Sequence, residues 1–267
     1  MRGLGHHTNL TPLLLALVLC CAPTVHAARL AIVVDDMGYS MRQSQRVLAL
    51  PGPIALAILP FAPRAQAIAR QASTAGKEVL VHQPMQALGR SHNHPDSGTL
   101  TLDMPAGRFV DLLAQAIDRL PTAVGVNNHA GSLLTQHAEP MNRLMAQLDA
   151  RGLFFVDSRT THKTVAVEVA HQWHVPVVQR DVFLDHVRTP VAVKNEFERA
   201  LGIARRNGHA LLIAHPNDLS LDFLEAALTR LPADVRLVGV SALLPKPDLA
   251  GFGPRENPAF QRISLAR

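Results

Sequence analysis

Residues 31–38 read Ala-Ile-Val-Val-Asp-Asp-Met-Gly, and the rest of the chain repeats the pattern that they set. Four apolar residues, three of them β-branched, predict a strand buried on both faces, as in a parallel sheet. Asp35 and Asp36 follow at its carboxyl end, where α/β sheets and barrels place their active sites. Two adjacent carboxylates repel each other, so the pair predicts a metal site or a base beside a ligand. The alternative is that one of them caps the next helix.

Apolar runs followed by polar residues recur down the chain. Further strands are expected over 54–59, 78–81, 123–126, 153–156, 175–178, 210–214 and 237–240, alternating with helices over 42–50, 63–75, 105–120, 140–150, 164–171, 191–206 and 221–231. Such alternation predicts an α/β fold with a parallel sheet and right-handed crossovers. Seven or eight units in about 220 residues favour an irregular (β/α) barrel, closed or nearly closed, over an open sheet.

The two ends of the chain depart from this pattern. Residues 1–28 combine Arg2, an apolar block over 13–21 and a small residue at Ala27, which is typical of a cleaved secretory signal peptide. An uncleaved anchor is the alternative. Residues 29–244 are expected to form one domain, and residues 245–267 are a Pro- and Gly-rich tail that we expect to be disordered.

Composition narrows the compartment and the partners. Both cysteines, Cys20 and Cys21, lie in the expected signal, so the mature chain would have no thiol, which suits an oxidising compartment. We therefore expect a periplasmic protein, without a transmembrane segment after cleavage because no later apolar run approaches the roughly 20 residues of a membrane span. The 26 basic residues exceed the 21 acidic ones, but the arginines are scattered along helices, which does not predict nucleic-acid binding.

Polar side chains follow most of the expected strands, and a parallel barrel brings such positions to one rim. They are Asp35, Asp36, His82, residues 127–129, Asp157, Arg180 and His215. One Asp and two His suit Zn²⁺ or a similar divalent ion that keeps a water. Such a water becomes a nucleophile near neutral pH, and a nearby carboxylate can accept its proton. Each histidine taken singly is better explained as a structural residue, and only their shared position favours a site.

Five motifs together resemble the divergent polysaccharide deacetylases, a distant branch of the NodB-type carbohydrate esterases. They are VDDMG over 34–38, GKEVLVHQPM over 76–85, GVNNHAGS over 125–132, FVDS over 155–158 and IAHP over 213–216. The resemblance covers residues 30–244. It implies an irregular βα barrel, a divalent metal and hydrolysis of an N- or O-acetyl group on a sugar.

By position, the resemblance implies Asp35 as catalytic base and Asp36 as metal ligand. His82 matches the first ligand histidine of the family, and His215 matches its general acid. The better-known enzymes place a second ligand histidine four residues after the first, and this chain has Gln86 there.

We therefore assign the third metal ligand to His129, which follows the fourth strand of the resembled barrel. His92 and His94 are rivals, but they lie in a loop rich in Gly, Pro and Asp, where solvated residues are expected.

These assignments predict a Zn²⁺-dependent carbohydrate deacetylase that acts on acetylated cell-envelope glycan, with a metal-held water attacking the acetyl carbonyl. Asp157 is expected to orient His215 or a sugar hydroxyl. Arg180 is expected to pair with Asp157 or Asp185. The expected substrate-binding residues are Asn128, Ser132 and Arg180.

Three further hypotheses are ranked below this one. Gln86 and the low aromatic content, with Tyr39 and Trp173 as the only Tyr and Trp, favour a catalytically inactive glycan-binding protein on the same barrel. A metal-free glycosidase using Asp35 and Asp157 ranks third, because it leaves the histidines without a role. A Ser-His-Asp hydrolase ranks last, because the chain has no Gly-x-Ser-x-Gly elbow.

Overall fold

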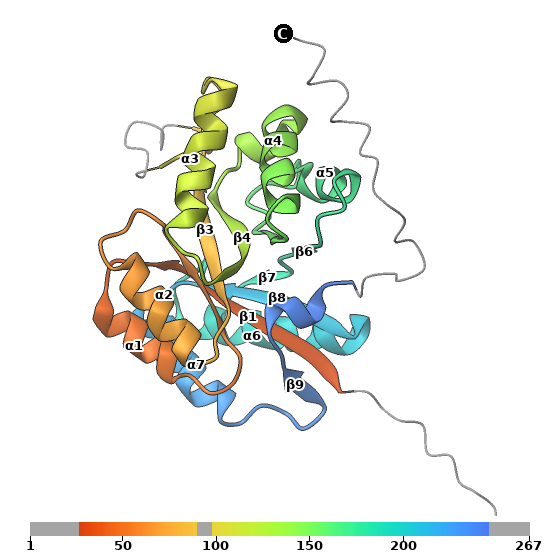
Figure 1. Cartoon of the computed structure of the whole chain (residues 1–267). Helices are drawn as coiled ribbons and strands as arrows, with labels where there is room; N and C mark the ends of the chain where they lie inside the picture. The colour runs from red at the N-terminus through yellow and green to blue at the C-terminus, as the bar shows by residue number, and fades with distance from the viewer. Residues whose placement is uncertain (1–26, 90–97, 246–267) are drawn as a thin grey trace, which may run out of the picture.

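A computed structural model describes residues 27–89 and 98–245, in which helices surround a curled parallel sheet (Figure 1). The strands are β1 (Ala28–Met37), β2 (Ala55–Ile58), β3 (Val79–Met85), β4 (Ala123–Ala130), β5 (Phe154–Asp157), β6 (Val177–Gln179), β7 (Val182–Phe183), β8 (His209–Ala214) and β9 (Val235–Leu237). The helices are α1 (Met41–Ala49), α2 (Ala65–Thr74), α3 (Ala106–Asp118), α4 (Ala138–Asp149), α5 (Ala166–Gln172), α6 (Pro190–Asn207) and α7 (Asp218–Leu228). Two 3₁₀ turns complete the description, η2 (Leu134–Gln136) and η3 (Val240–Leu243).

The sheet confirms the expected irregular α/β barrel of parallel strands. Its order is β6-β5-β4-β3-β2-β1-β8-β7, with β9 paired to β1, and every strand pairing within the described residues is parallel. The path of eight strands begins with β6 and ends with β7, and the described residues show no pairing between these two. The sheet is therefore a curled half-barrel that stays open at this seam.

Two apolar layers account for the continuous hydrophobic runs of the strands. In β1, Leu30, Ile32 and Val34 pack in the larger cluster beneath the helices, whereas Ala31 and Val33 belong to a second cluster inside the barrel. All five side chains are fully buried. A strand covered on both faces needs apolar residues at every position, which is why β1 lacks the alternation of a half-exposed strand.

The inner layer is closed at one end by η3. Val240 and Leu243 of this turn join the inner cluster. Glu78, next to the start of β3, accepts hydrogen bonds from the backbone N–H of Val240 at 2.6 Å and of Ser241 at 3.2 Å. The carboxylate thus ties the turn to the amino-terminal end of the sheet, opposite the strand ends that carry the polar motifs.

The structure differs from the sequence-based elements in several places. Strands β1, β3 and β4 run on to Met37, Met85 and Ala130, so they include polar residues that were expected to follow them. The two-residue strand β7 was not expected. The strand expected over 237–240 is replaced by β9, which ends at Leu237, and by the turn η3. Helix α7 begins at Asp218, three residues before the expected start at 221, because the Asn217 side chain caps it by accepting a hydrogen bond from the Ser220 N–H.

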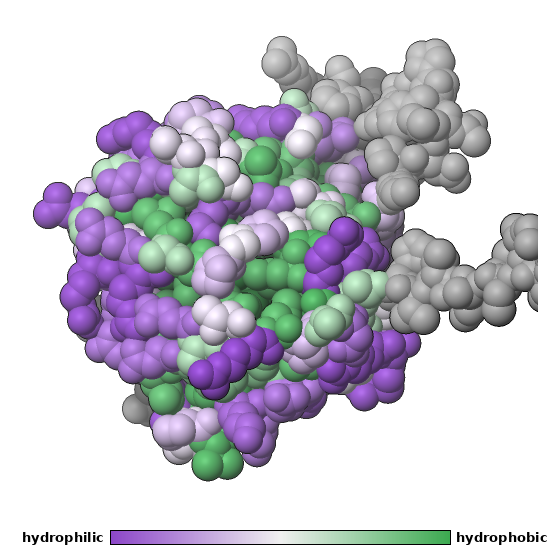
Figure 2. All heavy atoms as spheres, turned by 90° about the horizontal axis from the view of Figure 1, so that it is seen from below, coloured by the Kyte–Doolittle hydropathy of each residue, from purple (hydrophilic) through white to green (hydrophobic). Residues whose placement is uncertain are grey.

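The expected signal peptide lies almost wholly, and the expected tail beyond residue 245 entirely, outside the described residues. Among the helices that the structure does describe, none has the length and apolar character that a membrane crossing requires. Seen from below, the molecule shows an apolar area bordered by hydrophilic side chains (Figure 2). Apolar surface of this kind is common, because more than half of the surface of a folded protein is contributed by apolar atoms.

Candidate metal centre

Successive residues of a regular strand point to opposite faces, yet both carboxylates of β1 lie near one histidine. The pairing of β1 with β2 shifts register between Val34 and Met37, and Asp36 has a φ of 55°, in the left-handed region. This irregular strand end places Asp35 Oδ2 3.8 Å and Asp36 Oδ1 3.1 Å from Nε2 of His82. Backbone strain in a non-glycine residue is typical of functional sites.

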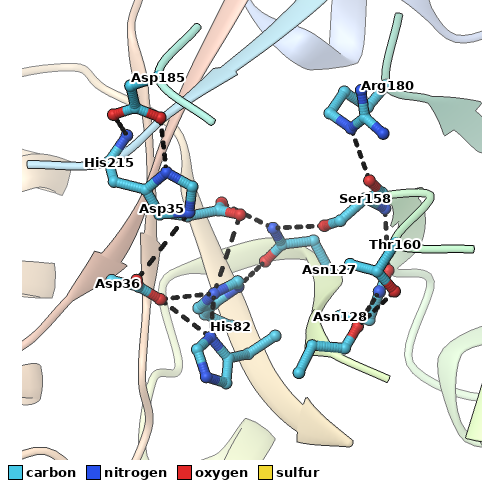
Figure 3. Close-up of polar contacts among 12 residues, drawn as sticks. Asp35, Asp36, His82, Asn127, Asn128, Ser158, Thr160, Arg180, Asp185 and His215 are labelled. Atoms are coloured by element: carbon cyan, nitrogen blue, oxygen red, sulfur yellow. Dashed lines mark hydrogen bonds and ion pairs between the residues drawn. The ribbon is translucent and has the colours of Figure 1, made fainter. Parts of the chain in front are cut away.

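Three side chains from three strands converge at this point. Asp36 comes from β1, His82 from β3 and His129 from β4. His129 Nδ1 lies 2.9 Å from Asp36 Oδ1 and 3.0 Å from His82 Nε2. The three candidate ligand atoms lie within 4.8 Å of one another. The structure thus brings together the three residues that were expected to bind a metal, and Figure 3 shows Asp36 and His82 facing each other.

Asn127 orients the His82 ring by a hydrogen bond at its Nδ1 atom. Its Nδ2 donates to Asp35 Oδ1 at 2.8 Å, and its Oδ1 lies 2.9 Å from His82 Nδ1. Because the ionised Asp35 carboxylate can only accept, the amide NH₂ must face Asp35 and the amide oxygen must face His82. His82 Nδ1 therefore carries a proton, and Nε2 is the ring nitrogen that faces Asp36 and His129.

The electrostatics of the cluster favour a positive charge at its centre. Burial would lower the pKa of His82, but the carboxylates of Asp35 and Asp36 outweigh burial and raise it. Burial would raise the pKa of Asp36, but hydrogen bonds from His129 and His82 outweigh burial and hold it below its ordinary value. Burial dominates at Asp35, where it raises the pKa despite the nearby His82.

This donor set fits a divalent metal ion. Two imidazole nitrogens and one carboxylate oxygen are ligands that Zn²⁺ accepts, and three protein ligands leave a coordination position open. Asn127 supplies the outer hydrogen bond that fixes the tautomer of a ligating histidine. The residues present therefore suit the group that the sequence led us to expect.

Gln86, which stands where a second ligand histidine would follow His82 by four residues, has another role. Its Oε1 accepts a hydrogen bond from the backbone N–H of Leu102 at 2.8 Å. The Gln86 side chain thereby holds the backbone of Leu102. The candidate ligand is supplied by β4 instead, as His129. His92 and His94, the rival ligands, lie outside the described residues.

His215 enters the site from the end of β8, supported by Asp185, which was expected to pair with Arg180 instead. Its Nδ1 lies 2.8 Å from Asp185 Oδ1, and its Nε2 lies 4.0 Å from Asp36 Oδ2. Burial would lower the pKa of His215, but the hydrogen bond with Asp185 outweighs burial and raises it. Figure 3 shows Asp185 behind His215, on the side away from Asp36.

The expectation that Asp157 orients His215 is therefore corrected in favour of Asp185. Asp157 is fully buried, and its carboxylate accepts from the Arg159 N–H, the Thr164 hydroxyl and the Gln179 amide. These donors hold it against the turn after β5 and against β6. The position of Asp185 after a short apolar run, Val-Phe-Leu over 182–184, could have indicated that it shares the rim with His215.

Arg180 also has partners other than the two carboxylates expected for it. Its Nε donates to the Ser158 carbonyl at 2.7 Å, and one terminal nitrogen donates to the Arg159 carbonyl at 2.8 Å. The guanidinium lies 3.7 Å from the centroid of the Phe183 ring, and that ring stacks against His215. Its position depends on backbone carbonyls of the turn, which a sequence pattern does not specify.

The other two expected substrate-binding residues form hydrogen bonds within the same wall. Buried Asn128 accepts from the Ser158 N–H and donates to the Ala130 carbonyl, both at 2.8 Å. Ser132 Oγ accepts from the Leu88 N–H at 2.9 Å. Ser132 also lines, with Arg180, a cavity of about 430 Å³ beside the site, whereas Asn128 does not line it.

Comparison with known proteins identifies relatives over nearly the whole chain. The protein YibQ of Escherichia coli (strain K12), described as uncharacterized, is 36% identical over 242 residues, which cover 91% of this chain and 75% of YibQ. The crystal structure of an uncharacterized protein from Agrobacterium tumefaciens C58 superposes with a TM-score of 0.76 at 27% identity and covers 82% of this chain and 89% of that one.

A more distant solved structure shares the fold. The peptidoglycan N-acetylglucosamine deacetylase Bc1960 superposes with a TM-score of 0.52 at 13% identity and covers 82% of this chain and 88% of that one. The family model for divergent polysaccharide deacetylases matches residues 32–244, which include every strand end described above. The chain belongs to the divergent polysaccharide deacetylase family.

Proposed function

We propose that this protein is an exported, metal-dependent deacetylase that acts on an acetylated glycan of the cell envelope. The convergence of Asp36, His82 and His129 at the carboxyl ends of β1, β3 and β4 carries this proposal. The similarity to Bc1960, which is described as a peptidoglycan N-acetylglucosamine deacetylase, favours a cell-wall glycan as substrate. A periplasmic location agrees with the signal-like sequence at residues 1–28.

Asp36, His82 and His129 would hold the ion, and we propose Zn²⁺ because of the two imidazole ligands. A bound Zn²⁺ supplies Lewis-acid polarisation of the acetyl carbonyl and lowers the pKa of water. Asn127 keeps a proton on His82 Nδ1, so that Nε2 remains the ligand atom.

Asp35 and His215 divide the proton transfers. Asp35 lies within 3.8 Å of His82 and is held by Asn127, which suits it to accept the proton of the attacking water as general base. His215 presents Nε2 toward Asp36 while Asp185 holds Nδ1. In this position it would protonate the leaving amine or alkoxide. Asp35 would thus hold the proton taken from water, and His215 would supply the proton that the leaving group gains.

Metal content and acetate release test the proposal together. We expect about one equivalent of zinc in the wild-type protein and loss of zinc in His82→Ala and in His129→Ala. Asp35→Asn should retain zinc and release acetate about 10²- to 10⁴-fold more slowly from an acetylated glycan, since it removes only the general base.

Absence of bound metal, even after zinc is added, would overturn the proposal. Stoichiometric zinc without acetate release from any acetylated glycan would contradict the deacetylase activity. That outcome would favour the glycan-binding hypothesis on the same barrel.

A further inference from the structure

The cavity beside the candidate metal centre is lined by residues that the deacetylation mechanism does not use. It has a volume of about 430 Å³, and its lining includes Ser132, Arg159, Thr160, Thr161, His162 and Arg180. Leu88 adds an apolar side chain to the lining, and the other lining residues carry hydroxyl, imidazole and guanidinium groups. A surface that combines apolar area with hydrogen-bonding groups and cations suits a sugar that carries negative charge.

The positive charge of the cavity is not neutralised by ion pairs. Within residues 27–89 and 98–245, no ion pair includes Arg159 or Arg180. Arg180 donates to the Arg159 carbonyl at 2.8 Å, and burial, together with the charge of Arg159, lowers the pKa of Arg180 to about 10. The acids that act on Arg180 are Asp157 and Asp181.

Those two acids are already engaged elsewhere. Asp157 accepts two hydrogen bonds from the turn after β5 and one from Gln179 of β6, and Asp181 Oδ2 accepts from the Leu211 N–H at 2.8 Å. Arg180 in turn donates to two backbone carbonyls. The exposed Arg159 has a φ of 49°, so the chain holds this residue in a strained conformation at the cavity wall.

The cavity and the candidate metal centre share a wall. The Thr160 hydroxyl donates to the Ala130 carbonyl at 2.8 Å, and Ala130 directly follows the candidate ligand His129. On the other side, Arg180 donates to the Ser158 carbonyl, and the Ser158 hydroxyl lies 3.4 Å from the Asn127 amide nitrogen. Figure 3 shows Arg180, Ser158 and Thr160 on one side of Asn127 and the Asp–His cluster on the other.

From this arrangement we propose that the cavity binds an anionic group of the glycan, a carboxylate or a phosphate, next to the acetylated sugar. The substrate is then an acidic glycan, and Arg159 determines that preference, because its guanidinium is free of the backbone contacts that fix Arg180. The inference rests on the proposed function, since it assigns a substrate class to the same site.

Binding measurements separate this inference from turnover. Three acetylated oligosaccharides of equal length are compared by calorimetry on the full chain carrying Asp35→Asn: a neutral N-acetylglucosamine oligomer, one with carboxylates on alternate sugars, and one with phosphate esters. We expect an acidic oligomer to bind about tenfold more tightly than the neutral one, the worth of one charge-assisted hydrogen bond. The tighter of the two acidic oligomers identifies the anion.

Variants test whether Arg159 carries the preference. Arg159→Gln should abolish it, Arg159→Lys should retain part of it, and raising the salt concentration should weaken only the acidic oligomers. Arg70→Gln, which removes an exposed arginine from α2, is the matched control and should leave all three affinities unchanged.

Equal affinity for neutral and acidic oligomers, or an unchanged preference in Arg159→Gln, would overturn the inference. Acetate release by the wild-type protein from neutral and acidic oligomers at equal rates would leave the deacetylase proposal intact while removing the acidic preference. Tight binding of acidic oligomers without acetate release by the wild-type protein would support the acidic preference and contradict the deacetylase proposal.

Discussion

Asn127 links the candidate base to a candidate metal ligand through a single side-chain amide. Replacing it by leucine removes the acceptor for His82 Nδ1–H and the donor to Asp35, while a side chain of similar volume remains. Because such outer hydrogen bonds fix ligand orientation, we expect Asn127→Leu to weaken zinc binding about 10- to 100-fold. Competition with a chromophoric chelator measures the affinity.

The control for this variant is another asparagine bonded to a ring nitrogen. Asn142 on α4 accepts from Trp173 Nε1 at 2.7 Å. Asn142→Leu removes that hydrogen bond and should leave zinc affinity unchanged. Equal weakening in both variants would mean that lost stability, and not the orientation of His82, explains the effect.

Asp185 illustrates how a buried carboxylate couples stability to pH. Burial would raise its pKa, but hydrogen bonds from His215 and Ser220 outweigh burial and hold it below the ordinary value of 3.8. A folded-state pKa below that of the unfolded chain means that the carboxylate stabilises the fold above about pH 4. This stabilisation is lost as the pH falls through the lowered value.

Asp185→Asn should therefore be less stable than wild type at pH 7, by about 1–3 kcal/mol, because buried donors lose a charged acceptor. The difference should narrow as the pH falls below 3.8. Urea unfolding of the metal-free proteins between pH 3 and pH 7 measures it. The control is Asp234→Asn, which breaks an exposed pair with Arg205 and should change stability little. A stability difference between Asp185→Asn and wild type that does not depend on pH would contradict the prediction.

At the scale of elements, the apolar runs were sufficient to predict most of the sheet. Runs such as 31–34 and 210–214 are buried on both faces, so their composition alone marks them as parallel strands. The same logic located the candidate metal ligands, because polar groups that follow such runs share one rim. His129 was therefore identified although the usual ligand position holds Gln86.

The parts that the sequence did not predict depend on short elements and on backbone geometry. Strand β7 has only two residues, Val182 and Phe183, so no periodicity marks it, and Asp185 beyond it was not recognised as the partner of His215. Arg180 binds carbonyls of a turn in which Arg159 has a positive φ. A backbone conformation of that kind is not encoded by residue spacing.

The turn η3 offers a test of how one element closes the barrel. Glu78 accepts hydrogen bonds from the N–H groups of Val240 and Ser241, and it also bonds the Ser241 hydroxyl. Glu78→Ala leaves these donors without their acceptor, so we expect the free energy of unfolding to fall by about 1–3 kcal/mol. Urea unfolding followed by circular dichroism measures the change.

A surface glutamate provides the comparison for Glu78. Glu139 pairs with Arg143 one turn along α4, and such exposed helix pairs contribute only about 0.3–0.5 kcal/mol. Glu139→Ala should therefore be close to wild type. Equal stabilities of the Glu78 and Glu139 variants would show that η3 does not depend on the Glu78 carboxylate.

At the scale of the whole molecule, the candidate metal centre joins strands that are distant in the sequence. Asp36, His82 and His129 belong to β1, β3 and β4, and the helices α1, α2 and α3 lie between them along the chain. The unfolded chain cannot present these three ligands together without paying the entropy of closing two long loops. An ion at this position therefore binds the folded state far better than the unfolded state.

Zinc should accordingly stabilise the protein by mass action. A free concentration one hundred times the dissociation constant adds about 2.7 kcal/mol to the free energy of unfolding, which corresponds to a rise in Tm of about 5–10 °C for a domain of this size. Thermal melts with a chelator and with buffered zinc measure the shift. In Asp36→Asn, which keeps the size of the side chain but loses its charge, the two melts should nearly coincide, whereas Asp234→Asn should respond as the wild type does. A Tm that rises equally in Asp36→Asn and wild type would place the stabilising ion elsewhere on the protein and would remove the physical basis for assigning these three residues as its ligands.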